Sequence, residues 1–192
     1  MSGQLPTSPV ARNADVRSEQ NTIVSVTTSG RVQARQIDGQ KFRISLVYPP
    51  MTRAEFAPIK AFLMKQRSRL NTFTVIPPTI SNALGTASGT PTGTASAGDT
   101  SITLGGSGTG TLKAGDYIKF NNHDKVYMVV EDQSDISTGT LTIEPPLRSA
   151  VSGTDIIYDN VSFTVRLTND IQEFSIGTTN LYQYELDVIE SL

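Results

Sequence analysis

The 192-residue chain contains no cysteine and no tryptophan, and it has a single histidine. Without cysteine, disulfide bonds and thiolate metal sites are excluded, so stability must come from packing or from association with other subunits. A membrane-spanning helix needs about 20 consecutive apolar residues, and no stretch of the chain approaches that length. The first residues lack the apolar run of a secretion signal. We therefore expect a protein that is made and kept soluble, with no membrane partner.

The scarcity of histidine argues against the commonest hydrolytic chemistry. His123 lies in a polar turn, where exposed structure is more common than catalysis. Glu131, Asp132 and Asp135 could serve as glycosidase carboxylates or as calcium ligands, but they lie at a hairpin end and match no ordered calcium-loop motif. The glycine-rich run 105–110 lacks the lysine and the helix of a phosphate-binding loop. The sequence thus predicts no catalytic, cofactor-binding or metal-ligating residue, no cofactor and no enzyme activity.

Charge of either sign is sparse as well. A formal charge of −2 and a pI near 5.4 provide no general basic field, so we expect no nucleic-acid binding. The basic run Lys65–Arg69 has no interleaved aromatic residues, and it either compensates a helix C-terminus or forms an intersubunit salt bridge with Glu185 and Asp187. The lack of tryptophan leaves carbohydrate recognition possible only in an inserted module.

The residues that are present favour strands. Hydrophobic residues make up only 37% of the chain and charged residues 18%, while Gly, Ser and Thr are abundant, which suits short strands and turns. Residues 1–20 are polar and predict an extended N-terminal arm that becomes ordered only against a partner. Residues 21–48 predict a β-meander with a turn at Asp38-Gly39, in which the apolar side chains from Phe42 to Tyr48 occupy every second position.

One helix is expected after this meander. Thr52 and Glu55 have the spacing of a capping box, and Met51 and Phe56 that of a hydrophobic staple. Pro58 lacks an amide, so we expect a distorted first turn or a start nearer residue 57. The segment from residue 73 to the following prolines 77 and 78 then predicts another strand.

The β-rich body is interrupted in the middle of the chain. Residues 81–111 contain 21 Gly, Ser or Thr residues, and we expect 81–97 to be a flexible linker. Residues 98–158 predict an inserted β module, a small barrel or sandwich of about five strands. Residues 161–167 and 171–176 are expected to pair with each other, before a last strand at 181–189. Residues 21–80 and 159–192 would form one discontinuous domain, and the fold class is mainly β: a sandwich-like belt with one packed helix, plus the inserted module.

Two stretches carry a family resemblance. Arg43–Ile59 and Asn180–Glu190 resemble structural proteins of tailed bacteriophages, in particular distal tail proteins, and residues 112–148 are similar to modules inserted in such proteins. The resemblance implies a β-rich belt domain with one helix that assembles into a ring at the end of the tail tube. It also implies a hexamer, with the tail tube and the tail tip or hub proteins as partners.

The resemblance therefore predicts a structural virion protein that is assembled in the host cytoplasm and joins the tail tube to the tip or baseplate. The insert would face outward, either as decoration or as a module that attaches to host surface glycans. The alternatives are a carbohydrate- or receptor-binding tail module and another ring-forming protein, such as a head-tail stopper or a tail terminator.

Overall fold

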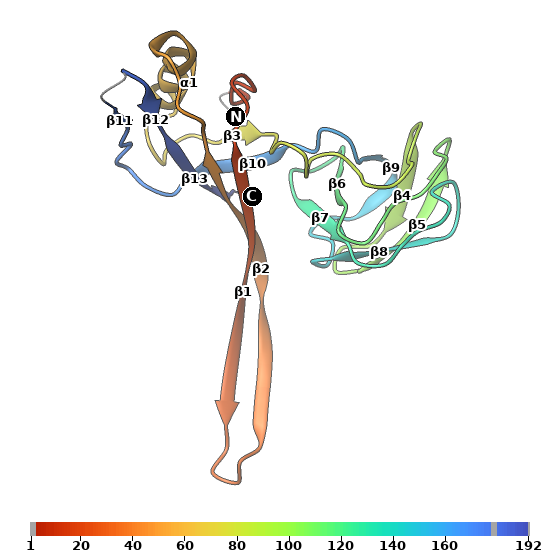
Figure 1. Ribbon diagram of the computed structural model, residues 1–192. Coiled ribbons are helices and arrows are strands. Elements are labelled where there is room, and N and C mark those ends of the chain that lie inside the picture. The colour runs from red at the N-terminus through yellow and green to blue at the C-terminus, as the bar shows by residue number, and fades with distance from the viewer. Residues whose placement is uncertain (1–2, 178–179, 192) are drawn as a thin grey trace.

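The computed structural model describes residues 3–177 and 180–191, which form a sheet with one helix and a separate closed barrel (Figure 1). Residues 1–2 of the predicted arm and residues 178–179 and 192 of the predicted belt lie outside the described residues. Strands dominate the described part, which contains one helix. The predicted fold class is confirmed as mainly β with one packed helix and a small inserted barrel, while the belt, predicted to be sandwich-like, is built on one five-stranded sheet and the helix.

Five strands form one antiparallel sheet in the order β1-β2-β13-β10-β3. Their bounds are Asn13–Val26 (β1), Val32–Val47 (β2), Phe73–Val75 (β3), Phe163–Leu167 (β10) and Glu185–Glu190 (β13). The sheet thus combines strands from before and after the barrel. The alternation predicted for β2 is confirmed, because Phe42, Ile44 and Leu46 are buried, as is Tyr48 just after the strand.

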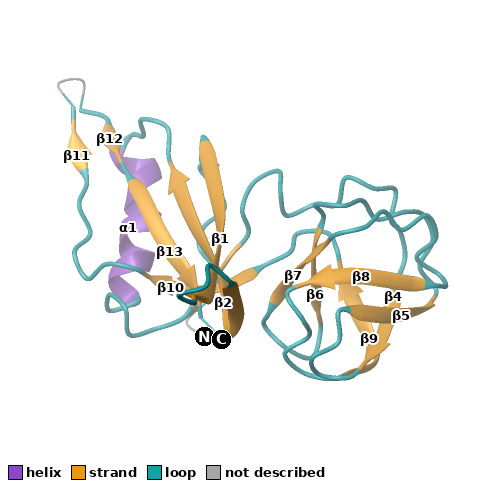
Figure 2. Ribbon diagram, turned by 90° about the horizontal axis from the view of Figure 1, so that it is seen from below, coloured by secondary structure: helices purple, strands orange, loops and turns teal. Residues whose placement is uncertain are grey.

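The helix α1, Arg53–Lys65, packs on one face of this sheet (Figure 2). The predicted capping box is confirmed: Glu55 N donates to Thr52 Oγ1 over 3.4 Å, and Thr52 N donates to Glu55 Oε2 over 2.8 Å. Met51 and Phe56, the predicted staple pair, are both buried in the core between helix and sheet.

Pro58 lies inside α1 without delaying its start. The helix begins at Arg53, so the alternative of a start nearer Ala57 was wrong. A proline in a helix interior costs about 3 kcal/mol. The helix also buries Phe56, Ile59 and Leu63, and each such side chain contributes about 1.5–3 kcal/mol. Burial of this face therefore outweighs the missing hydrogen bond.

Six strands close the barrel in the order β4-β5-β8-β7-β6-β9. Their bounds are Pro91–Ala95 (β4), Ser101–Gly106 (β5), Tyr117–Phe120 (β6), Val126–Val129 (β7), Thr140–Glu144 (β8) and Val151–Ile157 (β9). The predicted flexible linker 81–97 is therefore wrong in its second half, because β4 pairs with both β5 and β9. Ala83 and Ala87, from its first half, pack against the barrel core.

Glycine is the reason that β4 can close the barrel. A side chain at Gly93 would lie 2.8 Å from Ile102 Cγ2 and 2.8 Å from Phe120 Cε1. Those two side chains are fully buried and occupy the space that a larger residue would need. The composition that suggested a linker instead allows backbone and core side chains to approach closely.

The N-terminal segment is part of the fold, which corrects the predicted arm of residues 1–20. Leu5 is 5% exposed and belongs to the core of the sheet, and its amide donates to Thr74 O over 2.9 Å. From Asn13 onward the segment is the edge strand β1, paired with β2. Backbone pairing orders this polar sequence without a periodic apolar face.

Two predicted strand arrangements are also corrected. Residues 21–48 form no meander, because β2 continues through Asp38-Gly39, where the register with β1 shifts instead of turning. Residues 171–176 do not pair with 161–167: β10 pairs with β13 and β3, while β11 (Ser175–Ile176) pairs with β12 (Tyr182–Gln183).

Candidate assembly surfaces

The most prominent surface is the distal hairpin, which we define as residues 21–37 at the ends of β1 and β2. β13 pairs with β2 only from Arg43 to Val47, so the strands of the distal hairpin pair with each other alone. Figure 1 shows this ribbon extending well away from both the sheet and the barrel. Its exposed large apolar residues, 44–65% accessible, are Ile23, Val24, Val26, Val32 and Ile37.

The register divides the distal hairpin into two different faces. Val24 lies opposite Ala34 and Val26 opposite Val32, so one face is apolar toward the turn, while Thr22 opposite Gln36 continues that face with polar residues. On the other face Ile23 lies opposite Arg35, and Ile37 lies opposite Asn21. An isolated two-stranded ribbon is marginally stable in water, so a hairpin with apolar residues on both faces requires a partner surface.

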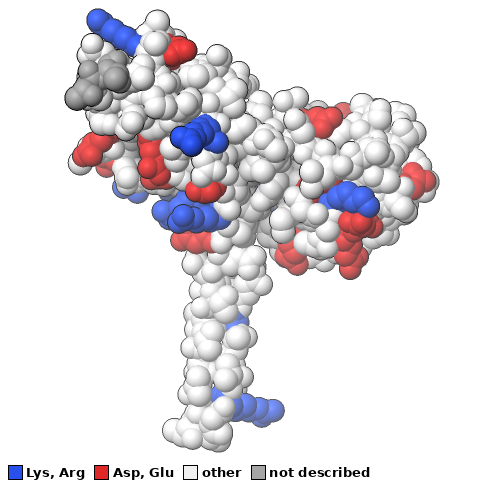
Figure 3. Space-filling view, in the orientation of Figure 1, with Lys and Arg blue, Asp and Glu red and all other residues white. Residues whose placement is uncertain are grey.

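The distal hairpin carries charge of only one sign. Arg31 and Arg35 are its two charged residues. Figure 3 shows the distal hairpin as an almost uncharged surface with basic atoms near its end. The described residues contain four ion pairs, and neither of these arginines takes part in one.

A groove of the opposite charge lies on the same sheet. We define the acidic groove as the surface formed by residues 168–173 with Glu185 and Asp187 of β13. It presents four carboxylates (Asp170, Glu173, Glu185 and Asp187) and no basic residue. Within it Ile171 is 73% exposed. None of the four carboxylates forms an ion pair with another described residue.

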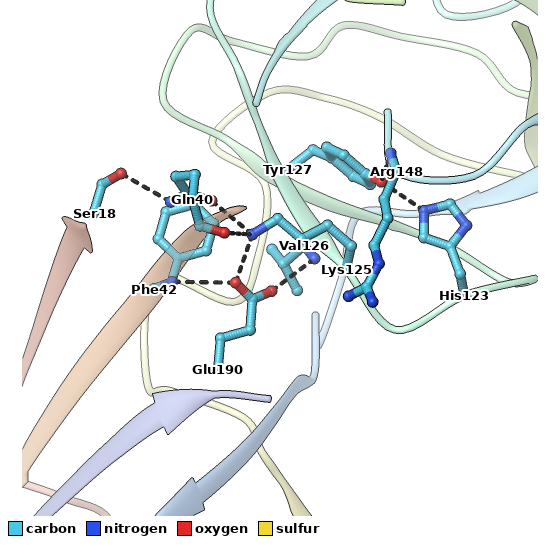
Figure 4. A network of polar contacts seen from close by, with 9 residues as sticks. All are labelled: Ser18, Gln40, Phe42, His123, Lys125, Val126, Tyr127, Arg148 and Glu190. Carbon is cyan, nitrogen blue, oxygen red and sulfur yellow. Dashed lines mark hydrogen bonds and ion pairs between the residues drawn. The ribbon is translucent and has the colours of Figure 1, made fainter. Parts of the chain in front are cut away.

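The barrel is joined to the sheet by a buried ion pair (Figure 4). Lys125 Nζ lies 2.5 Å from Glu190 Oε2, and the two side chains are 3% and 0% exposed. Lys125 Nζ also donates to Gln40 Oε1 over 2.6 Å and to Gln40 O over 3.1 Å. Lys125 precedes β7 of the barrel, whereas Gln40 and Glu190 belong to the sheet strands β2 and β13.

Backbone amides complete this network. Glu190 accepts from Phe42 N over 3.1 Å and from Val126 N over 3.2 Å. Burial lowers the pKa of Lys125, and the adjacent Glu190 opposes that shift. Because each charge has an opposite charge and further hydrogen bonds, the pair can persist without water. Val126 is buried in the core of the sheet, so apolar packing reinforces this connection. We call the contacts among Lys125, Gln40 and Glu190 the joint.

His123 is held by its neighbours in the barrel. Its Nε2 lies 2.7 Å from Tyr127 Oη and its Nδ1 lies 2.6 Å from Asn122 Oδ1, while Tyr127 Oη accepts from Arg148 N. This pattern assigns the proton to Nδ1 and leaves Nε2 as the acceptor of the tyrosine hydrogen. Burial, followed by the charge of Lys119, lowers the pKa of His123. These contacts give the histidine a structural role.

The three acidic residues considered as catalytic carboxylates or as calcium ligands each accept hydrogen bonds from nearby groups. Asp132 accepts from Ala114 N and Lys113 Nζ, Asp135 from Ser137, and Glu131 from Thr142 Oγ1. Hydrogen bonds from Ala114 N and then Lys113 lower the pKa of Asp132. Nowhere in the described ranges do three or more His, Asp or Glu side chains gather as a possible metal site.

The remaining motifs belong to the scaffold. The glycine run 105–110 ends β5 and approaches the backbone closely, since a side chain at Gly110 would lie 2.2 Å from Thr86 O. The basic run begins in the last turn of α1, and its Arg69 shares a groove with Asp187 of the same chain. In the barrel, Phe120 and Tyr127 are fully buried, and Tyr117 and Tyr158 are partly buried.

Sequence reasoning missed the joint, and of the acidic groove it singled out only Glu185 and Asp187, as candidate partners in an intersubunit salt bridge. One signal for the joint was present: Tyr184, Leu186, Val188 and Glu190 occupy alternate positions, so a carboxylate lies on the buried face of β13. Its partner Lys125 is 65 residues away, and no local pattern connects the two. The groove depends on a loop whose strand pairing was predicted incorrectly.

Comparison with known proteins bears on the barrel. Residues 80–161 match the family model described as distal tail protein pb9, B domain. The match includes all six barrel strands and the Gly/Ser/Thr-rich residues before them. None of the curated proteins searched matches the chain. In the described part of the chain, α1 is too short and too polar to cross a bilayer. The match confirms the resemblance to distal tail proteins of tailed phages, and residues 80–161 of this chain are similar to the B domain of distal tail protein pb9.

Proposed function

We propose that this chain is a non-enzymatic component of a tailed-phage virion, a distal tail protein that forms a ring between the tail tube and the tip or baseplate. The observation that supports ring formation best is the distal hairpin, which exposes apolar residues on both faces and has no partner within the described chain. The family match supports the tail as its location.

The proposed ring-building unit is the belt, residues 21–80 and 159–192 with β1 as its edge strand. Hairpin and sheet are different surfaces of one chain, so contacts between them are heterologous and close into a ring when the rotation between copies allows it. By resemblance the ring is a hexamer that contacts the tube and the hub through the belt. The barrel, predicted as residues 98–158 and extended here to include β4, is carried on this belt by the joint at Lys125.

Position in the virion separates this function from the other ring-forming tail proteins. Gold-labelled antibodies raised against the purified chain should bind the far end of the tail on intact particles. Labelling at the junction of head and tail would instead identify a stopper or terminator protein, and labelling along the whole tail would contradict both.

The role of the distal hairpin can be tested in the purified protein. A variant in which residues 21–37 are replaced by a two-residue Asn-Gly turn retains the buried part of β2 and all of the core. We expect its thermal unfolding to match that of the parent, and its native mass to be that of a monomer under conditions in which the parent forms rings. Rings of unchanged mass would exclude the hairpin as the ring contact.

A further inference from the structure

We propose that the acidic groove of one copy receives the distal hairpin of the next copy, with the Arg35 face of the hairpin directed into the groove. This inference rests on the proposed ring and specifies which two surfaces meet. It also assigns different surroundings to the two faces of the hairpin.

Charge complementarity is the first support. The distal hairpin has two arginines and no acidic residue, whereas the acidic groove has four carboxylates and no basic residue. Neither set is neutralised by an ion pair within the described chain. Arg12 lines the surface on one side of the groove, and Arg43, Arg69 and Arg166 line it on the other. The arginine of a neighbouring hairpin would therefore find its acidic partners between these basic edges.

The apolar residues support the same pairing. Ile171 within the groove is 73% exposed, and Phe174 and Ile176 beyond it are 39% and 54% exposed. On the hairpin, Ile23 lies directly opposite Arg35 and shares its face. One face of the ribbon thus presents an apolar and a basic side chain together, which matches an acidic groove that contains an exposed isoleucine.

The two surfaces cannot meet within one chain. Figure 1 shows the distal hairpin extending away from the body, while the loop between β10 and β11 that forms the acidic groove lies beside the helical side of the sheet. The contact must therefore join two copies. The other face, with Val24 and Val26, is left for the remaining neighbours in the ring.

Disulfide cross-linking between introduced cysteines tests this geometry. Native cysteines cannot interfere, because the chain has none. The first pair of variants is Ile23→Cys and Ile171→Cys, mixed, assembled and oxidised. The matched control mixes Val24→Cys with Ile171→Cys: Val24 is adjacent in sequence, similarly exposed at 60% against 56%, and directed to the opposite face. A disulfide requires two Cα atoms within about 7 Å, so the comparison reports which face meets the groove.

The expected result is a covalent dimer from the Ile23→Cys mixture in at least tenfold excess over the control mixture, with native mass confirming rings in both. Rings with equal cross-linking of the two mixtures, with more in the control or with none in either, would overturn the docking proposal and leave the ring intact. Failure of the cysteine-free parent to form any ring would contradict the proposed function itself, and the docking proposal with it.

Discussion

At the scale of single residues, the contacts of Lys125 hold the two parts of the molecule together. Its ammonium group connects the barrel to two strands of the sheet, and both members of the ion pair are almost completely buried. A buried pair of this kind contributes little net stability relative to an apolar pair, but loss of one partner leaves an uncompensated charge. The joint is thus sensitive to single substitutions.

Lys125→Met should destabilise the protein by about 3–5 kcal/mol, because the buried Glu190 would lose its positively charged partner. Urea unfolding followed by circular dichroism measures this loss. Adding Glu190→Gln should recover part of it by removing the charge.

The control substitution is Lys113→Met, which removes the exposed ion pair with Asp132, whose side chains are 48% and 58% accessible. It should change stability by at most about 1 kcal/mol. Equal effects of the two lysine substitutions would show that burial of the joint does not matter.

His123 gives the stability of the barrel a dependence on pH. Its pKa is lowered in the folded state, first by burial and then by Lys119, so the unfolded chain binds its proton more readily. The stability that depends on neutral His123 is present at high pH and is lost as the pH falls below the ordinary histidine value of about 6.5. Wild type should therefore lose more stability between pH 8 and pH 5 than His123→Gln. Parallel loss in both proteins would contradict this role.

At the scale of elements, the glycine-rich segments are structural parts of the barrel. Gly85 shows this most directly, because a side chain there would lie 2.0 Å from Thr111 O. A backbone oxygen cannot rotate away as the end of a side chain can. The barrel therefore depends on glycine at positions that composition alone assigned to a linker.

Gly85→Ala should destabilise the protein by about 1–3 kcal/mol through overpacking. The matched control is Gly105→Ala in β5, where the nearest atom would be Thr92 Oγ1 at 3.5 Å, an ordinary contact. Thermal unfolding of the two variants measures the difference. A similar melting temperature for both would show that the barrel can shift to accommodate the added group.

Elements defined by local patterns were predictable, and those defined by distant pairing were not. Thr52 and Glu55 specify the helix start within four residues, and the alternation from Phe42 to Tyr48 specifies a buried face. β1 shows little inward alternation, and most of its residues are exposed, so nothing in its sequence distinguished a strand from an arm. β4 packs through Gly93, which has no side chain to contribute to a pattern.

At the scale of the whole molecule, the chain consists of a sheet with a long projecting hairpin and a barrel fixed to the sheet's base. The inserted module and its family could be inferred from the sequence, and the family match over residues 80–161 agrees. The joint could not be inferred, and only Glu185 and Asp187 of the acidic groove were singled out, because each feature combines residues that are distant in sequence. Both surfaces considered for assembly, the distal hairpin and the acidic groove, belong to the sheet.

The native mass of the purified protein, measured by light scattering over a range of concentrations, tests the central claim most directly. The account predicts a discrete species of six times the 20.7 kDa of the chain, or a multiple of it, which the Asn-Gly hairpin variant does not form. A parent protein that remains monomeric at every concentration, with the same mass as the hairpin variant, would contradict the claim that the distal hairpin builds a ring.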